Sequence, residues 1–350
     1  MKIGLDLSAL ESARRTGVER YALQLGTALD ADPLHAVYGY SRRTLCPAPP
    51  FPCHRVSSSL PRPWWRSLRL AYAARAEGIQ HLHAPTSAAI PSRGFTRSRC
   101  VHDLGFLGTD GGGGDEAMNR WERRRRVAAL SREIPTIFPS EATRREFFSR
   151  FSDWSAPSVV IPHGVEAALF DDTALPTALP AEVPEAFALV LGTCRLRRQP
   201  ERLAELFREP IDGLSLVWAG GGHAPPSLRA GVPGLLFLGE VDDRTRRSLL
   251  DQAQLLIMPS RIEGFGIPAL EALARRCPVL AQDLPVYEET LGDHGVRVDF
   301  SEDSAFIEGL QRARTFSAAA REAGRQHAET FTWERSAKAH AEFFAELSAS

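Results

Sequence analysis

Lysine is almost absent from this sequence of 350 residues. Lys2 and Lys338 are its only lysines, and arginine supplies every other basic side chain. Arginine and lysine differ in shape and hydrogen bonding. Here, however, an arginine at a position where chemistry could use lysine can reflect composition alone.

Cysteines are few, and none has the spacing of a redox or metal motif. The five are odd in number, include no CxxC pair and lie mostly inside apolar, strand-like runs. Buried free thiols show this pattern. We therefore expect a reducing compartment.

Long apolar runs are also missing. No window approaches the roughly 18 apolar residues of a membrane-spanning helix. The run MKIGLDLSAL carries one positive charge and is interrupted by Gly4 and Asp6, so it lacks the apolar core of a signal peptide. These absences predict a cytoplasmic protein, at most peripheral to the inner face of the membrane.

Two motifs of nucleotide-using enzymes do not occur where they would be needed. G-x-G-x-x-G is missing between the first strand-like run and the first helix, which argues against a nicotinamide-dependent dehydrogenase. The only D-x-D, from Asp30 to Asp32, trails a helix before Pro33, which suits a surface turn. We therefore expect no metal ion and no cofactor.

What is present is a repeated alternation of short apolar runs with amphipathic segments of helix length. This pattern is typical of parallel α/β structure, and the chain is longer than one hydrophobic core usually serves. We predict a Rossmann-like domain over residues 1–170, completed by a C-terminal helix over 333–350, and a second Rossmann-like domain over 184–332. The proline-rich stretch 168–187 is the predicted linker. Because open α/β sheets bind ligands at the carboxyl ends of their strands, we expect the site in the cleft between the two domains.

The strand-like runs are, in order, KIGLDL, HAVYGY, IQHLHA, RCVHDL, TIFPS, VVIPHG, FALVLGTC, LSLVWAGG, GLLFLGEV, QLLIMPS, CPVLAQ and GVRVD.

Charge is divided unevenly along the chain. Residues 1–170 carry a net charge of +7 and residues 171–350 carry −8. A basic first half suits an anionic acceptor or a membrane surface, and a dipolar protein without an anionic partner is the alternative. The arginines of 120–126 suit lipid phosphate, with a solvated helix face as the alternative. We expect Trp64 and Trp65 to cap the first domain's core, and an interfacial position is the alternative.

The segment RIEGFGIPALEALA carries the strongest motif. Pro268 suits the first turn of a helix, and the loop 263–266 stands directly before it. A helix N-terminus favours phosphate, and glycine lets the backbone approach a ligand closely. Glu271 can accept hydrogen bonds from the two hydroxyls of a ribose, while Glu263 lies nearer a sugar. The alternative is that both glutamates are solvated charges beside the helix.

This segment resembles the E-x7-E motif of the retaining glycosyltransferase family 4, in particular its bacterial mannosyltransferase-like group 1 members. The resemblance implies the α/β GT-B fold, in which two Rossmann-like doubly wound domains face each other across a cleft and the final helix crosses back to the N-terminal domain. It extends in order and spacing through RTGVERY, VHDLGFL, FPSEATRREF, IPHGV, VLGTCRLRRQPERL, LLFLGEVDDRTRRSLLDQAQLLIMPS and FTWERSA.

The resemblance also implies roles for the matching residues. Arg197 and Arg198 neutralise the donor's diphosphate, and His102 lies beside the reacting sugar carbon. The catalytic positions are thus His102, Glu263, Arg197 and Arg198. The donor-binding positions are Gly17, Gly264, Phe265, Gly266, Ile267 and Glu271.

The implied activity is a metal-independent, retaining transfer of a hexosyl unit, mannose-type favoured. The donor is a GDP-sugar or UDP-sugar, the acceptor is a saccharide or lipid-linked glycan, and no nucleic acid takes part. Preorganised cations stabilise the leaving diphosphate, and its oxygen is expected to take the acceptor's proton. One alternative is a catalytically inactive GT-B subunit that binds or scaffolds. The other is a glycoside hydrolase, but its carboxylates stand ~5 to 9.5 Å apart, whereas eight residues of helix advance ~12 Å.

Overall fold

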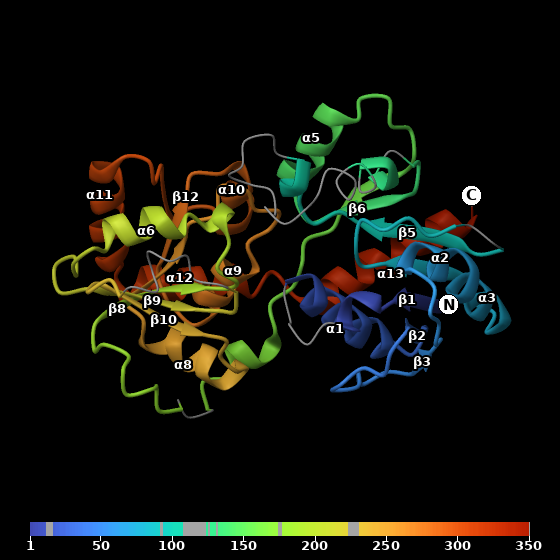
Figure 1. Ribbon diagram of the computed structural model, residues 1–350, viewed down its shortest axis with the longest axis horizontal. Coiled ribbons are helices and arrows are strands. Elements are labelled where there is room, and N and C mark those ends of the chain that lie inside the picture. The colour runs from blue at the N-terminus through green and yellow to red at the C-terminus, as the bar shows by residue number, and fades with distance from the viewer. Residues whose placement is uncertain are drawn as a thin grey trace. The chain divides into compact units, whose positions relative to one another are not determined.

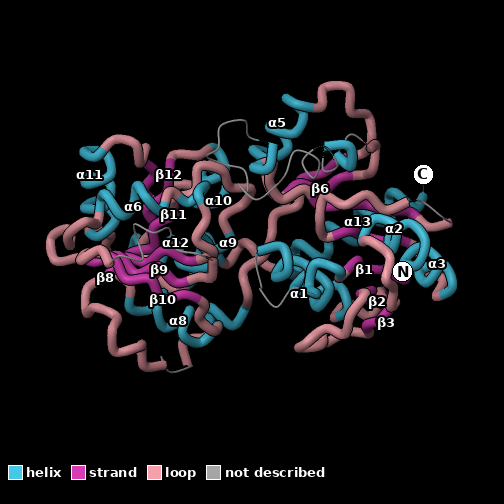
Figure 2. The backbone as a smooth tube through the Cα atoms, in the orientation of Figure 1, coloured by secondary structure: helices cyan, strands magenta, loops and turns pink. Residues whose placement is uncertain are grey.

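The computed structural model describes residues 1–11, 17–91, 94–107, 124, 127–130, 132–173, 177–222 and 231–349. Among these, the first compact unit comprises residues up to 104, 124–164 and 332–349, and the second comprises 105–107 and 165–331. Each unit contains one sheet of parallel strands with helices around it (Figure 1, Figure 2). The predicted fold class, α/β with two Rossmann-like domains, is confirmed.

Seven strands form the sheet of the first unit. Their order is β3-β2-β1-β4-β5-β6-β7, so the direction of winding reverses between β1 and β4. In open α/β sheets this switch point is where ligands bind. The bounds are β1 Lys2–Asp6, β2 Ala36–Ser41, β3 Cys53–Arg55, β4 His81–Ala84, β5 Thr96–Cys100, β6 Thr136–Phe138 and β7 Ser158–Val160.

Helices with apolar stripes complete the first unit. On α1, Tyr21, Leu25 and Leu29 follow one another at four-residue spacing and are buried, as a helix face on a core requires. The C-terminal helix α13 packs against α1 and β5 (Figure 1) and adds Trp333 and Phe344 to the same core. The expected return of the final helix to the first domain is confirmed. The helical elements are η1 Ser8–Glu11, α1 Gly17–Asp30, α2 Arg62–Trp64, η2 Trp65–Leu70, α3 Ala71–Ala76, α5 Glu141–Arg150 and α13 Trp333–Ala349.

The second unit has six strands in the order β10-β9-β8-β11-β12-β13. Every residue of the central strands β8 and β11 is buried, as expected for parallel strands covered on both faces. The winding reverses between these two strands. The strands are β8 Phe187–Leu191, β9 Ser215–Ala219, β10 Leu235–Gly239, β11 Leu255–Met258, β12 Val279–Gln282 and β13 Val296–Val298. The helical elements are η3 Gly105–Leu107, η4 Ala167–Phe170, η5 Leu196–Arg198, α6 Pro200–Leu206, α8 Asp243–Gln252, α9 Ile267–Ala274, α10 Pro285–Leu291, α11 Asp303–Arg314 and α12 Ala318–Ala328.

The chain passes from one unit to the other after Gly164 and again after Phe331. The N–H of Val165 donates to the carbonyl of Phe331 at 2.9 Å. A Cβ on Gly164 would stand 2.3 Å from the backbone nitrogen of Trp333. Glycine is therefore required where these two segments meet.

The stretch 168–187, predicted as the linker, begins inside the second unit. The carbonyl of Leu169 accepts a hydrogen bond from Arg275 at 2.8 Å, and that of Phe170 accepts one from Arg325 at 2.6 Å. These bonds explain why the first unit ends before the expected residue 170.

The first sheet differs from the sequence prediction in two strands. β3 was not expected, because it has only three residues, of which two are exposed, and lies at the sheet's edge. β5 starts earlier than expected and ends at Cys100, so His102 lies in the loop after the strand.

None of the helices in the described part of the chain is both long and apolar enough to cross a membrane. The predicted basic segment 120–126 lies outside the described residues, apart from Arg124.

Candidate active site

The donor-site residues predicted in the second unit gather at one edge of its sheet. Arg197 and Arg198 follow β8, and the loop 263–266 follows β11. β8 and β11 are the neighbours at which the winding reverses. Since ligands of open α/β sheets bind at such a point, the fold brings two separate predicted segments to one place.

Hydrogen bonds join the two loops. The N–H of Arg261 donates to the carbonyl of Arg197 at 2.8 Å. The side chain of Gln199 donates to the carbonyl of Pro259 at 2.7 Å and accepts from Nε of Arg261 at 3.1 Å. Gln199 has a φ of 52°, which is uncommon for a residue other than glycine. The loops are thus held in one arrangement.

Arg198 lies folded beneath Gly192. Only 9% of its surface is exposed, and its guanidinium donates to the carbonyl of Leu191. Gly192 has a φ of 115°, and a Cβ there would lie 2.7 Å from Nη1 of Arg198, so glycine leaves the room that the guanidinium needs. Burial lowers the pKa of Arg198, and the charge of Glu263 opposes that effect. The fold thus fixes a cation at the end of β8.

Glu263 interacts electrostatically with Arg198, and one of its carboxylate oxygens has no hydrogen bond among the described residues. Its Oε2 is buried and has no hydrogen-bond partner in the described part of the chain. The same holds, among the described residues, for the hydroxyls of Tyr287 and Ser260. Burial first, and then the charge of Glu263, raise the pKa of Tyr287, whereas Arg198 and Arg197 lower it. Buried polar atoms in native proteins nearly always have partners, so each of these three atoms has room for a hydrogen bond from ligand or solvent.

Glycine shapes the turn into α9. Gly266 precedes the helix with a φ of 84°, and a Cβ on it would lie 2.7 Å from Cε1 of Tyr287. The tyrosine ring therefore packs directly against the turn. Pro268 stands in the first turn of α9, as predicted. The partial positive charge of the helix N-terminus lies at this turn. Of the predicted donor positions here, Gly264, Phe265 and Gly266 are buried and Ile267 is half-buried.

Glu271 has an ion-pair partner that the sequence did not predict. Its side chain is 1% exposed, and Oε2 accepts a hydrogen bond from Nη1 of Arg246 at 2.7 Å. Asp242 caps α8 by accepting from the N–H of Thr245, which fixes the helix turn that carries Arg246. Ribose binding by Glu271 stays a prediction, and the structure shows that this carboxylate is held in place.

In the first unit, Gly17 begins α1, and a Cβ on it would meet nothing within 4 Å. His102 is held at both ring nitrogens. Its Nε2 lies 2.9 Å from the carbonyl of Pro85, which can only accept, so Nε2 donates and Nδ1 is left to accept from Nε2 of His163 at 3.1 Å. Burial lowers the pKa of His102, although the bond to Pro85 and two nearby carboxylates raise it. A neutral, oriented imidazole results.

His102 borders a buried cluster of histidines around Tyr21. The ring centroids of Tyr21 and His102 are 4.8 Å apart. Nδ1 of His340 donates to the carbonyl of Ser336 at 2.7 Å, so its Nε2 accepts from the Tyr21 hydroxyl at 2.8 Å. That hydroxyl has one proton, so Nε2 of His83, at 3.0 Å, must donate to it. These bonds link β4, α1 and α13.

The hydrogen-bond chain continues from His83 into β5. Ser98 Oγ lies 2.8 Å from Nδ1 of His83 and 2.8 Å from Nε2 of His81. Burial lowers the pKa of His81 to about 3 and that of His340 to about 4. It also holds the pKa of His83 and of His163 well below the ordinary value. His163, in the segment IPHGV, therefore belongs to a buried neutral cluster.

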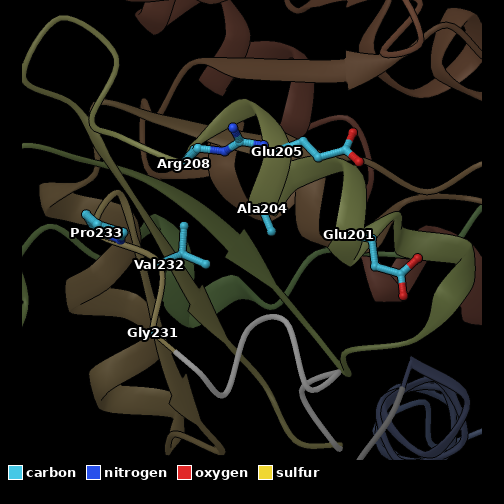
Figure 3. A pocket seen from close by; sticks show the side chains of 7 residues that line it. All are labelled: Glu201, Ala204, Glu205, Arg208, Gly231, Val232 and Pro233. Atoms are coloured by element: carbon cyan, nitrogen blue, oxygen red, sulfur yellow. The ribbon is translucent and has the colours of Figure 1, made fainter.

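A pocket of 440 Å³ in the second unit is lined by none of these residues. Figure 3 shows its lining, which comes from α6, from Arg208 after it and from the turn 231–233. That turn precedes the amino end of β10, and the rest of the lining runs along α6. The candidate site is at the carboxyl ends of β8 and β11.

Residues 196–315 match the family model described as Glycosyl transferases group 1. The second unit carries a group 1 glycosyltransferase domain. The match includes the predicted residues Arg197, Arg198, Glu263 and Glu271.

Curated relatives match parts of this chain. The O-antigen chain mannosyltransferase RfbU of Salmonella typhimurium is 37% identical over 75 residues, which is 21% of this chain and 21% of RfbU. The lipopolysaccharide core biosynthesis mannosyltransferase LpcC of Rhizobium leguminosarum bv. viciae is 31% identical over 179 residues, 44% of this chain and 49% of LpcC. The matched segments thus span less than half of each relative.

Solved structures match over nearly the whole chain. The sucrose-phosphate synthase of Thermosynechococcus elongatus has a TM-score of 0.75 at 21% identity, covering 99% of both chains. Anabaena Alr3699/HepE in complex with UDP and glucose has a TM-score of 0.72 at 15% identity, covering 99% of this chain and 100% of that one. At these identities the likeness concerns the fold, which is GT-B.

Four residues at the candidate site were missed from the sequence. They are Gln199, Arg246, Ser260 and Tyr287. Gln199 directly precedes Pro200 at a helix start, and this position gave a weak signal for a special turn. Arg246 and Ser260 lie in a segment that resembles the family but gave them no role, and Tyr287 lies outside the segments that carry the resemblance.

Proposed function

We propose that this chain is a retaining glycosyltransferase. It moves a hexosyl unit, mannose favoured, from a nucleotide diphosphate sugar to a hydroxyl of a saccharide or lipid-linked glycan. The observation that carries the proposal is the buried Oε2 of Glu263, which has no partner among the described residues and lies near the Arg198 cation. The names of RfbU and LpcC favour mannose, and the complex of HepE with UDP and glucose supports the donor class.

The cluster around Glu263 suits the hydroxyl groups of a sugar. A carboxylate oxygen accepts a hydrogen bond from one hydroxyl, and the Tyr287 and Ser260 hydroxyls can each donate or accept. Hydrogen bonds to charged groups are stronger than those between neutral groups. Glu263 therefore supplies most of the sugar binding, and the two hydroxyls add selectivity.

The adjoining elements suit a nucleoside diphosphate. The turn from Gly264 to Ile267 places a helix N-terminus, which favours phosphate, next to the sugar subsite. Glu271, fixed by Arg246, accepts from the ribose hydroxyls. Arg197 and Arg198 then stabilise the charge that develops on the diphosphate.

The reaction breaks the bond between the anomeric carbon and the phosphate oxygen, and the bonding electrons stay on the diphosphate. The acceptor hydroxyl bonds to the same face of that carbon, and its proton passes to the released phosphate oxygen. No side chain is needed as nucleophile. His102 and Gly17 of the first unit contact the donor in this proposal, with His102 neutral because burial lowers its pKa.

The proposal also holds that transfer needs no metal ion or cofactor, that the protein works in the cytoplasm, and that no nucleic acid takes part. Peripheral membrane contact through 120–126 stays a prediction, since that segment lies outside the described residues except for Arg124.

The direct test is to incubate the protein with GDP-mannose and, separately, with UDP-glucose. Thermal stabilisation and slow release of nucleoside diphosphate are expected from one of them, because a donor at a hundredfold excess over its Kd stabilises a protein by about 2.7 kcal/mol. With an acceptor, proton NMR should show that the anomeric configuration of the donor is kept.

Other outcomes separate the alternatives. Stabilisation without any release of nucleoside diphosphate, even with acceptors, would indicate an inactive binding subunit. Hydrolysis of simple aryl glycosides without nucleotide would indicate a glycoside hydrolase. Neither stabilisation nor turnover with any GDP- or UDP-sugar would contradict the proposed function.

A further inference from the structure

Three large apolar side chains stand exposed along one face of the helix formed by residues 62–76. Trp64 is 62% exposed, Leu68 is 44% exposed and Tyr72 is 77% exposed. They follow one another at four-residue spacing, close to one turn of helix. Elsewhere in the described part of the chain, Leu34 is the one large apolar side chain that is exposed to this degree. We call Trp64, Leu68 and Tyr72 the outer stripe.

The opposite face of this helix is firmly packed. Trp65, Leu70 and Ala74 are fully buried in a core cluster of the first unit. The indole N–H of Trp65 donates to the carbonyl of Val56 at 2.7 Å. The expectation that both tryptophans cap the core is therefore right for Trp65 and wrong for Trp64, which points away from the core. The outer stripe is a stable surface of a well-anchored helix.

Two exposed arginines lie on the same helix as the outer stripe. Arg69 and Arg75 are exposed, and no acidic residue occurs from 61 to 76. Arg62 is exposed as well, but stands 3.8 Å from the carboxylate of Glu11. We therefore assign the free positive charge of this face to Arg69 and Arg75.

Arg66 belongs to the inner side and does not contribute to this charge. Its Nε donates to Asp6 at 2.5 Å, and its Nη2 donates to Ser8 at 2.9 Å. This ion pair fixes the rotation of the helix about its axis, so the same three apolar side chains always face outward.

We propose that the outer stripe docks on the surface of an anionic phospholipid bilayer. Trp and Tyr rings suit the boundary between headgroups and acyl chains, because one end of each is apolar and the other can be hydrated. Arg69 and Arg75 beside them pair with lipid phosphates. Charge favours a bilayer over a second copy of this chain as the partner, because two copies of the same basic face would repel each other. The proposal does not depend on the proposed transferase activity.

The test is cosedimentation of the full chain with vesicles. Vesicles of equal parts phosphatidylglycerol and phosphatidylcholine are compared with vesicles of phosphatidylcholine alone. The wild type should bind the anionic vesicles at least tenfold more tightly. Removing one arginine near an anionic surface weakens binding about fivefold, so the double variant Arg69→Gln/Arg75→Gln should bind about 25-fold more weakly.

Matched controls distinguish vesicle binding through the outer stripe from nonspecific vesicle binding. The double variant Trp64→Ser/Tyr72→Ser should bind at least tenfold more weakly, whereas Leu34→Ser, which removes an equally exposed side chain elsewhere, should bind as the wild type does. Arg208→Gln, an exposed arginine of the second unit, is the matched charge control. Because all these side chains are exposed, the melting temperatures should stay within a few degrees of the wild type.

A fluorescence readout places the contact directly. Vesicles with brominated acyl chains should quench Trp64, and Trp64→Phe should keep binding but lose this quenching. No binding to anionic vesicles, or binding that both double variants retain, would overturn the proposal. So would self-association that depends on the outer stripe without vesicle binding, since this would indicate a protein partner.

Discussion

Lowering the pH from 7.5 to 5 should destabilise the first unit, because its buried histidines are neutral when folded. A histidine in the unfolded chain has a pKa of about 6.5, while burial lowers that of His81 to about 3 and that of His340 to about 4. The unfolded chain therefore binds more protons in this range. Stability is fully present above pH 6.5 and falls as the pH drops toward the folded values. Each of the two loses about 2 kcal/mol by pH 5, or about 4 kcal/mol together.

This value is a lower limit, since His83 and His163 are shifted in the same direction. Tyr21 and Cys100, which face the cluster, are neutral at these pH values because burial raises their pKa, and Asp103 and Glu19 act on His102 at its border. Carboxylates that titrate near pH 4 contribute little above pH 5. A loss of this size is a large part of the total stability of a domain, about 5 to 15 kcal/mol.

The assay is native-state hydrogen exchange resolved by peptide, followed on the segments of β4 and α13 as a function of pH. The variant His340→Asn can still donate to Ser336 and should lose about 2 kcal/mol of the pH dependence, whatever its stability at pH 7.5. A change in the free energy of opening below about 1 kcal/mol between pH 7.5 and 5 would show that these histidines do not have lowered pKa values in the folded unit.

Three further predictions concern the candidate site. Arg246→Ala leaves Glu271 buried without its cation and should lower the free energy of unfolding in urea by about 3 to 5 kcal/mol. Arg244→Ala on the same helix should lower it by less than about 1 kcal/mol. Equal losses in the two variants would contradict a buried ion pair. Tyr287→Phe keeps the packed ring, so the free energy of unfolding without donor should not fall by more than about 1 kcal/mol. Sugar transfer should nevertheless slow about tenfold, which corresponds to the loss of one hydrogen bond. An unchanged transfer rate would show that the Tyr287 hydroxyl does not contact the donor. EDTA should leave the initial transfer rate within about twofold, and a loss that Mg²⁺ restores would show metal dependence.

The strands of the second unit were predictable because they lie in short, mainly apolar runs, four of which are ended by glycine or proline. All six expected runs there contain a strand. In the first unit β3 was not predicted, because Cys53 and Arg55 are exposed at the sheet's edge and no apolar pattern marks the strand.

The orientation of the two adjacent tryptophans could not be predicted from the sequence either. Composition alone cannot tell which one faces inward, and the rotation of the helix is set by the contact of Arg66 with Asp6, which lies 60 residues away in the sequence.

At the candidate site, motif residues could be named from the sequence but their partners could not. Glu263 and Glu271 belong to a spaced motif. Arg246, on α8, is not part of that motif, and it meets Glu271 of α9 only in the folded unit. Tyr287, near the start of α10, belongs to no segment that the sequence singled out. Its significance comes from the buried hydroxyl and the charge of Glu263, which depend on the tertiary structure.

In the proposed function, Glu263 binds the donor sugar at the carboxyl edge of the second sheet. The most direct test is the transfer rate of Glu263→Gln with the nucleotide sugar that the wild type uses best, beside Glu205→Gln, an exposed glutamate near the C-terminal end of α6. We predict that Glu263→Gln loses at least about a hundredfold in rate, or about 2.7 kcal/mol, with an unchanged melting temperature, while Glu205→Gln keeps the wild-type rate. A Glu263→Gln protein that transfers sugar at the wild-type rate would contradict this role of Glu263.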